Sequence, residues 1–247
     1  MENIVKIVTR TYGAKLHEYC KAFIDLPYEI IPVKGVGNDQ YIKKILSLDV
    51  DFIINIDEDC FVYDNYEILN LLQYMIDNNY DYCGVPDGGV LFPRKGSPIV
   101  MNPFFNIFDL RKIRPKLLEA KIGEKIANHK GRRALKNKKI ANYKEEKLLE
   151  QINVPLKTPI FKPATKENYY PIFYWLARNF KPLYLNGFTH SDKRTSVLLS
   201  HRNKRLCYHT WLARHYKENK TYDGINQRVR IDNLVRELAQ ELNVKID

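Results

Sequence analysis

Short apolar runs alternate with amphipathic segments through the first 86 residues, and this alternation is the strongest constraint on the fold. The apolar runs predict strands at residues 3–10, 28–34, 52–56 and 81–86. Between them, apolar side chains recur at helical spacing in residues 14–24, 40–50 and 65–76. Alternation of this kind favours an α/β fold with a doubly wound, mostly parallel sheet flanked by helices.

One of these strands runs directly into three carboxylates, in the stretch "FIINIDEDCF" at residues 52–61. Ligands of open α/β sheets bind beyond the carboxyl ends of the strands, where Asp57 and Asp59 are expected. Two carboxylates one residue apart can approach a single Mg²⁺ or Mn²⁺ ion. A metal ion held there can neutralise a diphosphate leaving group. The alternative interpretation is a solvated acidic turn, because D-x-D occurs often by chance.

The positive charge of the chain is concentrated in one segment. The chain has 247 residues, enough for one large α/β domain, and a formal net charge of +11. Between Arg111 and Lys147 there are 14 Lys and Arg residues against 4 Glu. We therefore expect a single domain over 1–247, with a basic helical insertion at about 111–150 and a C-terminal helix at about 222–243.

Cysteine spacing and hydropathy indicate where in the cell the protein is expected. Cys20, Cys60, Cys83 and Cys207 form no C-x-x-C pair, which argues against a zinc site and a disulfide framework, so reduced thiols are expected. No run of 18 apolar residues exists, and the N-terminal apolar stretch is too short for a signal peptide. These features favour a cytoplasmic protein, and attraction of residues 111–147 to an anionic membrane adds peripheral binding as a second expectation.

The segment "FIINIDEDCFVYD" resembles the D-x-D segment of glycosyltransferases of the GT-A fold. The first strand with its "TRTYG" turn and the late "CYHTWLARHY" are similar to the same family, so the resemblance covers about 1–110 and 160–217. It implies a GT-A-type fold and a metal-dependent enzyme that transfers a sugar from a nucleotide-diphosphate sugar, with a UDP-sugar favoured. The implied acceptor is a hydroxyl of a glycan or lipid-linked molecule, in polysaccharide or glycan assembly.

The resemblance also implies the site residues. Asp57 and Asp59 would hold Mn²⁺ or Mg²⁺, and His209 would complete the metal shell, although a packed histidine beside Trp211 is the alternative. The implied nucleotide-sugar contacts come from Thr9, Arg10, Tyr12, Asp39, Asp57 and Arg214, with Lys204 and Arg205 as weaker diphosphate candidates. Arginine suits such bidentate contacts to phosphate oxygens.

An inverting transfer also needs a base that takes the proton from the acceptor hydroxyl. Glu167 stands at a predicted helix start and is the first candidate, although a carboxylate is favoured there by the helix dipole alone. Asp192, in "THSDKRTS", is the second candidate, and a turn-forming Asp is its simpler interpretation. Asn102, Asn106 and Asp109, in "VMNPFFNIFDL", either line a sugar pocket or belong to the core. The stereochemistry of transfer stays open.

Two other functions compete with the transferase. A nucleic-acid-binding protein would use the basic segment 111–147, but Tyr143 is its only aromatic residue and no known RNA- or DNA-binding signature is present. A sugar nucleotidyltransferase shares the general sheet and metal chemistry, yet "TRTYGAK" has few of the glycines expected after its first strand. Both alternatives are therefore ranked below the glycosyltransferase.

Overall fold

The structure is a computed structural model that describes residues 3–87, 97–119 and 167–246. Its centre is a six-stranded sheet in the order β2-β1-β3-β6-β5-β7. The strands are β1 (Val5–Thr11), β2 (Ile30–Lys34), β3 (Phe52–Ile56), β5 (Tyr82–Pro86), β6 (Met101–Asp109) and β7 (Pro182–Tyr184). Only β6 runs against the others, because its pairings with β3 and β5 are antiparallel and the remaining pairings are parallel. The predicted α/β class with a mostly parallel sheet is confirmed.

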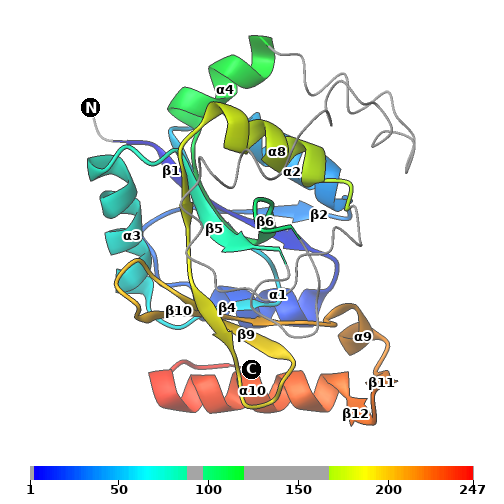
Figure 1. The fold of residues 1–247 in the computed structure, drawn as a ribbon. Coiled ribbons are helices and arrows are strands. Elements are labelled where there is room, and N and C mark those ends of the chain that lie inside the picture. The colour runs from blue at the N-terminus through cyan, green and yellow to red at the C-terminus, as the bar shows by residue number, and fades with distance from the viewer. Residues whose placement is uncertain (1–2, 88–96, 120–166, 247) are drawn as a thin grey trace.

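Helices cover both faces of this sheet (Figure 1). One face packs against α2 (Asn38–Leu46), α4 (Leu110–Glu119) and α8 (Tyr170–Asn179). The other packs against α1 (Ala14–Ala22) and α3 (Asn65–Asp77). The side chains of β3 alternate between the two faces of the sheet. Ile54 belongs to the core on the side of α1 and α3, and Ile53 to the core on the side of α2, α4 and α8, as expected for a strand buried on both faces.

A second sheet lies beside the first and carries the late part of the chain (Figure 1). Its order is β4-β10-β9-β8, formed by β4 (Cys60–Val62), β10 (Arg205–Thr210), β9 (Thr195–Leu199) and β8 (Gly187–Thr189). The pairing of β10 with β4 sets His209 opposite Cys60, one residue after Asp59. Short α9 (Arg214–Lys217), a hairpin of β11 (Thr221–Tyr222) and β12 (Ile225–Asn226), and α10 (Gln227–Leu242) complete the fold.

Several elements differ from the sequence-based expectation. The apolar residues within 183–188 predict one strand there, but the chain forms two, β7 in the central sheet and β8 in the second sheet, because it changes sheets after Leu185. The C-terminal helix begins at Gln227 instead of 222, where the side chain of Asn226 accepts a hydrogen bond from the Val229 amide and caps it. The predicted basic insertion lies outside the described residues from position 120 onward.

Strand β6 was not predicted, and its polar side chains belong to the centre of the sheet. Asn55 of β3 accepts from the Tyr41 hydroxyl and donates to Pro103 O at 2.6 Å and to Asn106 Oδ1 at 3.2 Å. A Cβ at Gly84 of β5 would clash with Asn106 Nδ2, so only glycine lets these strands approach so closely. Asn106 is therefore a core residue that links neighbouring strands.

Two further expectations can be compared with the described residues. Cys20, Cys60, Cys83 and Cys207 are all buried free thiols, as predicted. In the part of the chain that the structure describes, no helix combines the length and hydropathy needed to cross a bilayer.

Candidate active site

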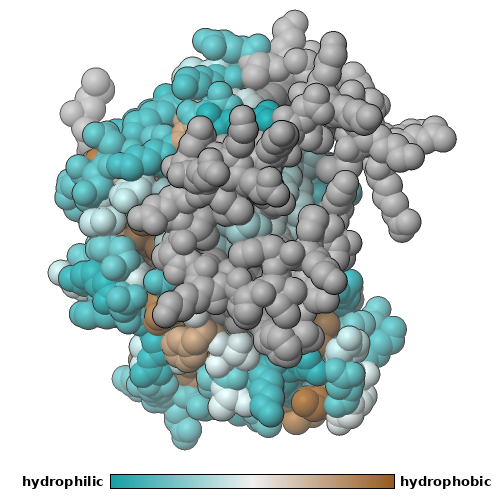
Figure 2. All heavy atoms as spheres, viewed as in Figure 1, coloured by the Kyte–Doolittle hydropathy of each residue, from teal (hydrophilic) through white to brown (hydrophobic). Residues whose placement is uncertain are grey.

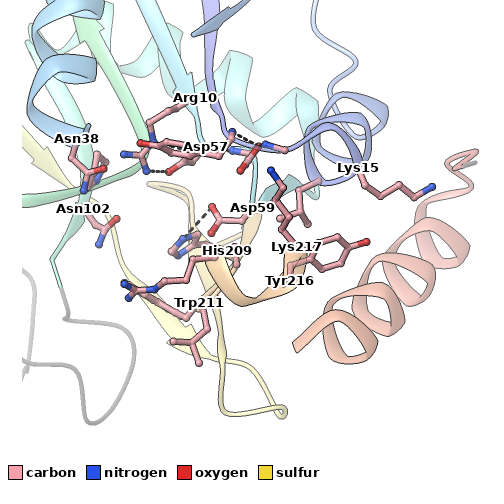
Figure 3. A pocket seen from close by; sticks show the side chains of 18 of the residues that line it. Arg10, Lys15, Asn38, Asp57, Asp59, Asn102, His209, Trp211, Tyr216 and Lys217 are labelled. Carbon is pink, nitrogen blue, oxygen red and sulfur yellow. Dashed lines mark hydrogen bonds and ion pairs between the residues drawn. The ribbon is translucent and has the colours of Figure 1, made fainter. Parts of the chain in front are cut away.

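A cavity of about 880 Å³ opens where β1 and β3 end and the second sheet begins (Figure 3). Its wall contains residues from both halves of the chain, which the pairing of β4 with β10 brings together. Of the predicted site residues, those that line the cavity are Arg10, Tyr12, Asp57, Asp59, Glu167, His209 and Arg214. The cavity therefore lies where open α/β sheets bind their ligands.

Asp57 is paired with a buried arginine from the neighbouring strand. Arg10 donates from Nη2 to Asp57 Oδ2 at 2.5 Å and from Nε to Oδ1 at 3.4 Å, and both side chains are almost fully buried. The rings of Tyr12 and Tyr41 each lie 5.5 Å from the Arg10 guanidinium carbon. Burial raises the pKa of the Asp57 carboxyl, and the charge of Arg10 acts in the opposite direction. Arg10 Nη1 is buried without a hydrogen-bond partner.

Glu58 fastens the loop after β1, a role that was not predicted. One of its carboxylate oxygens accepts from Thr11 Oγ1 at 2.8 Å, the Tyr12 amide at 3.0 Å and the Gly13 amide at 3.2 Å. Burial raises the pKa of Glu58, while these hydrogen bonds favour the charged form. Glu58, the middle residue of the acidic triplet Asp57-Glu58-Asp59, thus holds together the ends of β1 and β3, which form part of the cavity wall.

Asp59 and His209 face each other without a hydrogen bond. Asp59 Oδ1 lies 3.5 Å from His209 Nε2, and both Asp59 Oδ1 and His209 Nδ1 are buried with no hydrogen-bond partner. The imidazole is held between Phe104, stacked at a ring distance of 4.0 Å, and Trp211 at 4.6 Å. Leaving a buried polar atom unsatisfied costs about 1–3 kcal/mol. Asp59 and His209 therefore leave two buried polar atoms with unused hydrogen-bonding capacity at the cavity wall.

The side chains at the cavity provide only part of a binding site for a divalent cation. Among residues 3–87, 97–119 and 167–246, no three His, Cys, Asp or Glu side chains gather closely enough to hold a metal ion. The structure thus does not assemble Asp57, Asp59 and His209 into one shell, because Asp57 is turned to Arg10. Asp59 and His209 are a carboxylate and an imidazole with unsatisfied buried atoms. Mg²⁺-type sites commonly use one or two carboxylates, waters and substrate phosphates, so this smaller set still fits.

Three predicted residues do not line the cavity: Thr9, Asp39 and Asp192. Thr9 is buried within β1, and Asp39 stands in the first turn of α2. Asp192 accepts from the Thr195 hydroxyl at 2.7 Å and from Arg230 at 2.8 Å, and it also accepts from two backbone amides. Its burial would raise its pKa, but these hydrogen bonds outweigh burial and lower it. The geometry of Asp192 is that of a turn-forming residue.

The weaker diphosphate candidates also have other partners. Lys204 lies 3.5 Å from the buried carboxylate of Glu67. Arg205 donates to the Tyr208 hydroxyl at 2.9 Å and lies 3.5 Å from Glu241. Neither residue lines the cavity.

The cavity also contains residues that the sequence did not single out as ligands: Lys15, Asn38, Tyr169, Trp211, Lys217 and Arg228. Asn102 lines it as well, and its amide donates to Asp87 Oδ1 at 2.7 Å. The other Asp87 oxygen accepts from the Tyr170 hydroxyl at 2.7 Å. This buried network ties β6 to the start of α8, which follows Glu167. In Figure 3, Asn38 and Asn102 lie on one side of Asp59, and Lys15 and Lys217 lie on the other.

Comparison with known proteins gives a fold likeness and no family. No family model matches the chain, and no curated protein matches it. The similar solved structures include a mannosyltransferase of Pyrobaculum calidifontis in complex with GDP-Man and Mn²⁺, at 13% identity and a TM-score of 0.34. That match covers 49% of this chain and 47% of the mannosyltransferase, so the chain spans about half of that protein's length.

Two further structures cover more of the chain. Residues 1–349 of TarS from S. aureus match at 11% identity and a TM-score of 0.36, over 98% of this chain and 66% of that one. A cytidylyltransferase from Leptospira borgpetersenii matches at 12% identity and a TM-score of 0.36, over 100% of both chains. Glycosyltransferases and a nucleotidyltransferase are thus both among the neighbours. At these TM-scores the likenesses do not establish an activity for this chain.

Proposed function

We propose that this protein is a metal-dependent glycosyltransferase that moves a sugar from a nucleotide-diphosphate sugar to a hydroxyl of a glycan or lipid-linked acceptor. One observation carries the proposal. The D-x-D stretch ends a central strand at a cavity of about 880 Å³, and there Asp59 and His209 keep buried polar atoms without partners. A solvated acidic turn, the competing interpretation of that stretch, would not bury these atoms.

The donor would be held mainly by residues near the ends of β1 and β3. Arg10 keeps one nitrogen without a partner beside Tyr12, whose ring is half exposed at the cavity and suits contact with a base or ribose. Arg214 lines the same cavity and would bind diphosphate oxygens. Mn²⁺ or Mg²⁺ held by Asp59 and His209 would neutralise charge on the departing diphosphate.

Glu167 is the proposed base for an inverting reaction. It lines the cavity just before α8, and its backbone carbonyl accepts from the Tyr170 amide at 3.1 Å. In the reaction, the bond between the anomeric carbon and the diphosphate oxygen breaks and a bond to the acceptor oxygen forms. The proton of the acceptor hydroxyl passes to the Glu167 carboxylate. Asp192 is left out of this scheme because its carboxylate holds a turn outside the cavity.

The described part of the basic segment favours the transferase over nucleic-acid binding. Arg111 and Lys112 form ion pairs with Asp109 and Asp81 at 2.7 Å. Arg114 pairs with Asp49. These cations are therefore already neutralised within the domain, whereas phosphate-binding surfaces present unpaired positive charge. We propose that the whole chain, 1–247, works as one catalytic domain.

Thermal shift with UDP, GDP, CDP and dTDP, each with and without Mn²⁺, tests the proposal. A ligand at 100 times its dissociation constant adds about 2.7 kcal/mol to the free energy of unfolding, which raises the melting temperature measurably. We expect a Mn²⁺-dependent shift with one nucleotide, with UDP favoured, and its loss in Asp59→Ala. Asp77→Asn, which changes an exposed carboxylate on α3, is the matched control and should keep the shift. No shift with any of the four nucleotides would contradict the proposal.

A further inference from the structure

Exposed apolar side chains gather at one place beside the cavity. Eight large hydrophobic residues are exposed in the described part of the chain, and three of them fall within residues 222–229. They are Tyr222 at 44% exposure, Ile225 at 40% and Val229 at 55%, here called the apolar tip. Apolar atoms are visible among hydrophilic ones near the start of α10 (Figure 2). Exposed apolar clusters rimmed by polar residues mark interaction sites more often than isolated exposed residues do.

The apolar tip stands on a defined hairpin. Tyr222 and Ile225 are directly opposed across β11 and β12. The two residues between them, Asp223 and Gly224, have φ angles of +49° and +74°, the pattern of a tight two-residue hairpin turn. Val229 follows in the first turn of α10, where its amide donates to the Asn226 side chain at 3.1 Å. The backbone thus holds these apolar side chains on ordered elements at the surface.

Positive charge surrounds the apolar tip. Residues 214–229 contain four basic side chains, Arg214, Lys217, Lys220 and Arg228, against Glu218 and Asp223. Both acids are paired: Glu218 with Lys220 at 2.8 Å, and Asp223 with Arg194 from the second sheet. The Arg228 guanidinium donates to the Tyr216 and Lys217 carbonyls at 3.2 and 3.1 Å, which fixes α10 against α9. The surface therefore combines apolar residues at its tip with net positive charge around them.

Exposed apolar side chains next to positive charge indicate which kind of partner this surface binds. Apolar side chains inserted at the headgroup boundary, with Lys and Arg beside anionic headgroups, are the general means by which proteins bind a bilayer surface. Tyrosine suits this boundary because its ring is apolar and its hydroxyl is polar. A second copy of the chain fits less well, because a symmetric interface would bring the same cations face to face.

We infer that residues 217–229 dock on an anionic lipid bilayer through the apolar tip and the cations Lys217, Lys220 and Arg228, while Arg214 stays with the cavity. Lys217 and Arg228 also line the cavity, so docking would hold the cavity at the bilayer surface. None of these residues belongs to the basic segment 111–147. The inference stands whether or not the cavity transfers sugars. If it does, a lipid-linked acceptor is the acceptor class that this placement would serve.

Co-sedimentation of the full-length chain with vesicles tests the inference. The vesicles contain phosphatidylcholine alone or phosphatidylcholine mixed with phosphatidylglycerol. We expect binding to the anionic vesicles, weakened by 0.5 M salt, and at least tenfold weaker binding for the triple variant Tyr222→Ser, Ile225→Ser, Val229→Ser. The matched control is the double variant Tyr66→Ser, Phe188→Ser, which removes exposed aromatic residues at 66% and 46% exposure on α3 and β8 and should bind like the parent.

The remaining outcomes overturn the inference. Absence of vesicle binding by the parent chain would do so, and so would equal binding to neutral and anionic vesicles. Anionic binding that the triple variant retains would assign it to another surface, such as 111–147. Light scattering tests whether a second copy of the chain binds the apolar tip instead. If the parent forms a dimer, the triple variant does not, and neither binds vesicles, then the apolar tip serves self-association. The melting temperature of each variant shows that it is folded.

Discussion

Neighbouring residues of the acidic triplet differ in how their carboxylates are partnered. Asp57 is paired with Arg10, and Glu58 accepts three hydrogen bonds from residues 11–13; we call this side the paired wall. Asp59 and His209 form the open wall, where a carboxylate oxygen and an imidazole nitrogen are buried without partners. Buried polar groups are normally satisfied, so an exception needs a reason. We expect stability to depend mainly on the paired wall and metal binding on the open wall, while Arg10 Nη1, which has no hydrogen-bond partner, remains available to the nucleotide.

The largest expected effect comes from breaking the paired wall. Arg10→Met leaves the buried Asp57 carboxylate without its counter-charge, and we expect a loss of about 3–5 kcal/mol in the free energy of unfolding. Urea denaturation measures it. Lys6→Met is the control, because Lys6 pairs with Glu29 at the surface and should cost about 1 kcal/mol or less. A loss for Arg10→Met as small as that of the control would refute the role assigned to the paired wall.

A change in the open wall should show the opposite pattern. Asp59→Asn is expected to lower the sugar-transfer rate about 100-fold, as loss of a metal-supporting group does. Its free energy of unfolding should stay within about 1 kcal/mol of the parent, since Asp59 Oδ1 accepts no hydrogen bond. Transfer from the radiolabelled donor and urea denaturation measure the two quantities. A large loss in the free energy of unfolding with an unchanged transfer rate would show that Asp59 stabilises the fold and does not take part in the transfer.

Asp192 gives a pH-dependent test of a carboxylate that belongs to neither wall. Its folded-state pKa is lowered, so its contribution to stability is present above the unfolded value of about 3.9 and is lost as the pH falls through the folded value. Asp192→Asn should therefore cost about 1.5–3 kcal/mol at pH 7, and less as the medium is acidified. Urea denaturation at several pH values between 7 and 3 follows this difference. A difference that does not change with pH would contradict the assignment, as would a lost transfer activity at full stability.

The smallest expected effect concerns one hydrogen bond of the paired wall. Thr11→Val removes the hydroxyl that donates to Glu58 and keeps the shape of the side chain. Two backbone amides still donate to that carboxylate, so we expect a loss of about 1–2 kcal/mol in stability and no change in nucleotide binding. Urea denaturation and the nucleotide thermal shift measure these. Loss of nucleotide binding by a stably folded Thr11→Val variant would contradict this expectation, because Thr11 does not line the cavity.

Local patterns were sufficient for the first half of the fold. Strand β3 occupies residues 52–56 as predicted, because its apolar run and the carboxylates after it are both visible in sequence. The same pattern located the cavity at the end of that strand. Asp64 directly precedes the helical segment that begins at residue 65, as an N-cap residue does, and it accepts a hydrogen bond from the Glu67 amide at the start of α3.

Features that depend on pairing between distant segments could not be predicted. The Arg10–Asp57 pair joins residues 47 positions apart and exists because β1 and β3 are parallel neighbours. Strand β6 was not predicted because Asn102, Pro103 and Asn106 interrupt its apolar run, although these groups bond across the sheet or at the cavity. A turn-forming Asp was the simpler interpretation of Asp192, and its hydrogen bonds with residues 194 and 195 agree with it, whereas its contact with Arg230 could not be predicted.

Mn²⁺ binding at the Asp59–His209 wall can be measured directly. The electron paramagnetic resonance signal of free Mn²⁺ is titrated with protein in the presence of the nucleotide that gives the thermal shift. We expect the parent and Asp77→Asn to deplete the free signal equally, and Asp59→Asn to bind Mn²⁺ at least tenfold more weakly while it remains as stable as the parent. Equal Mn²⁺ binding by Asp59→Asn and the parent would show that the open wall does not hold the metal, and the proposed metal-dependent transfer would be wrong.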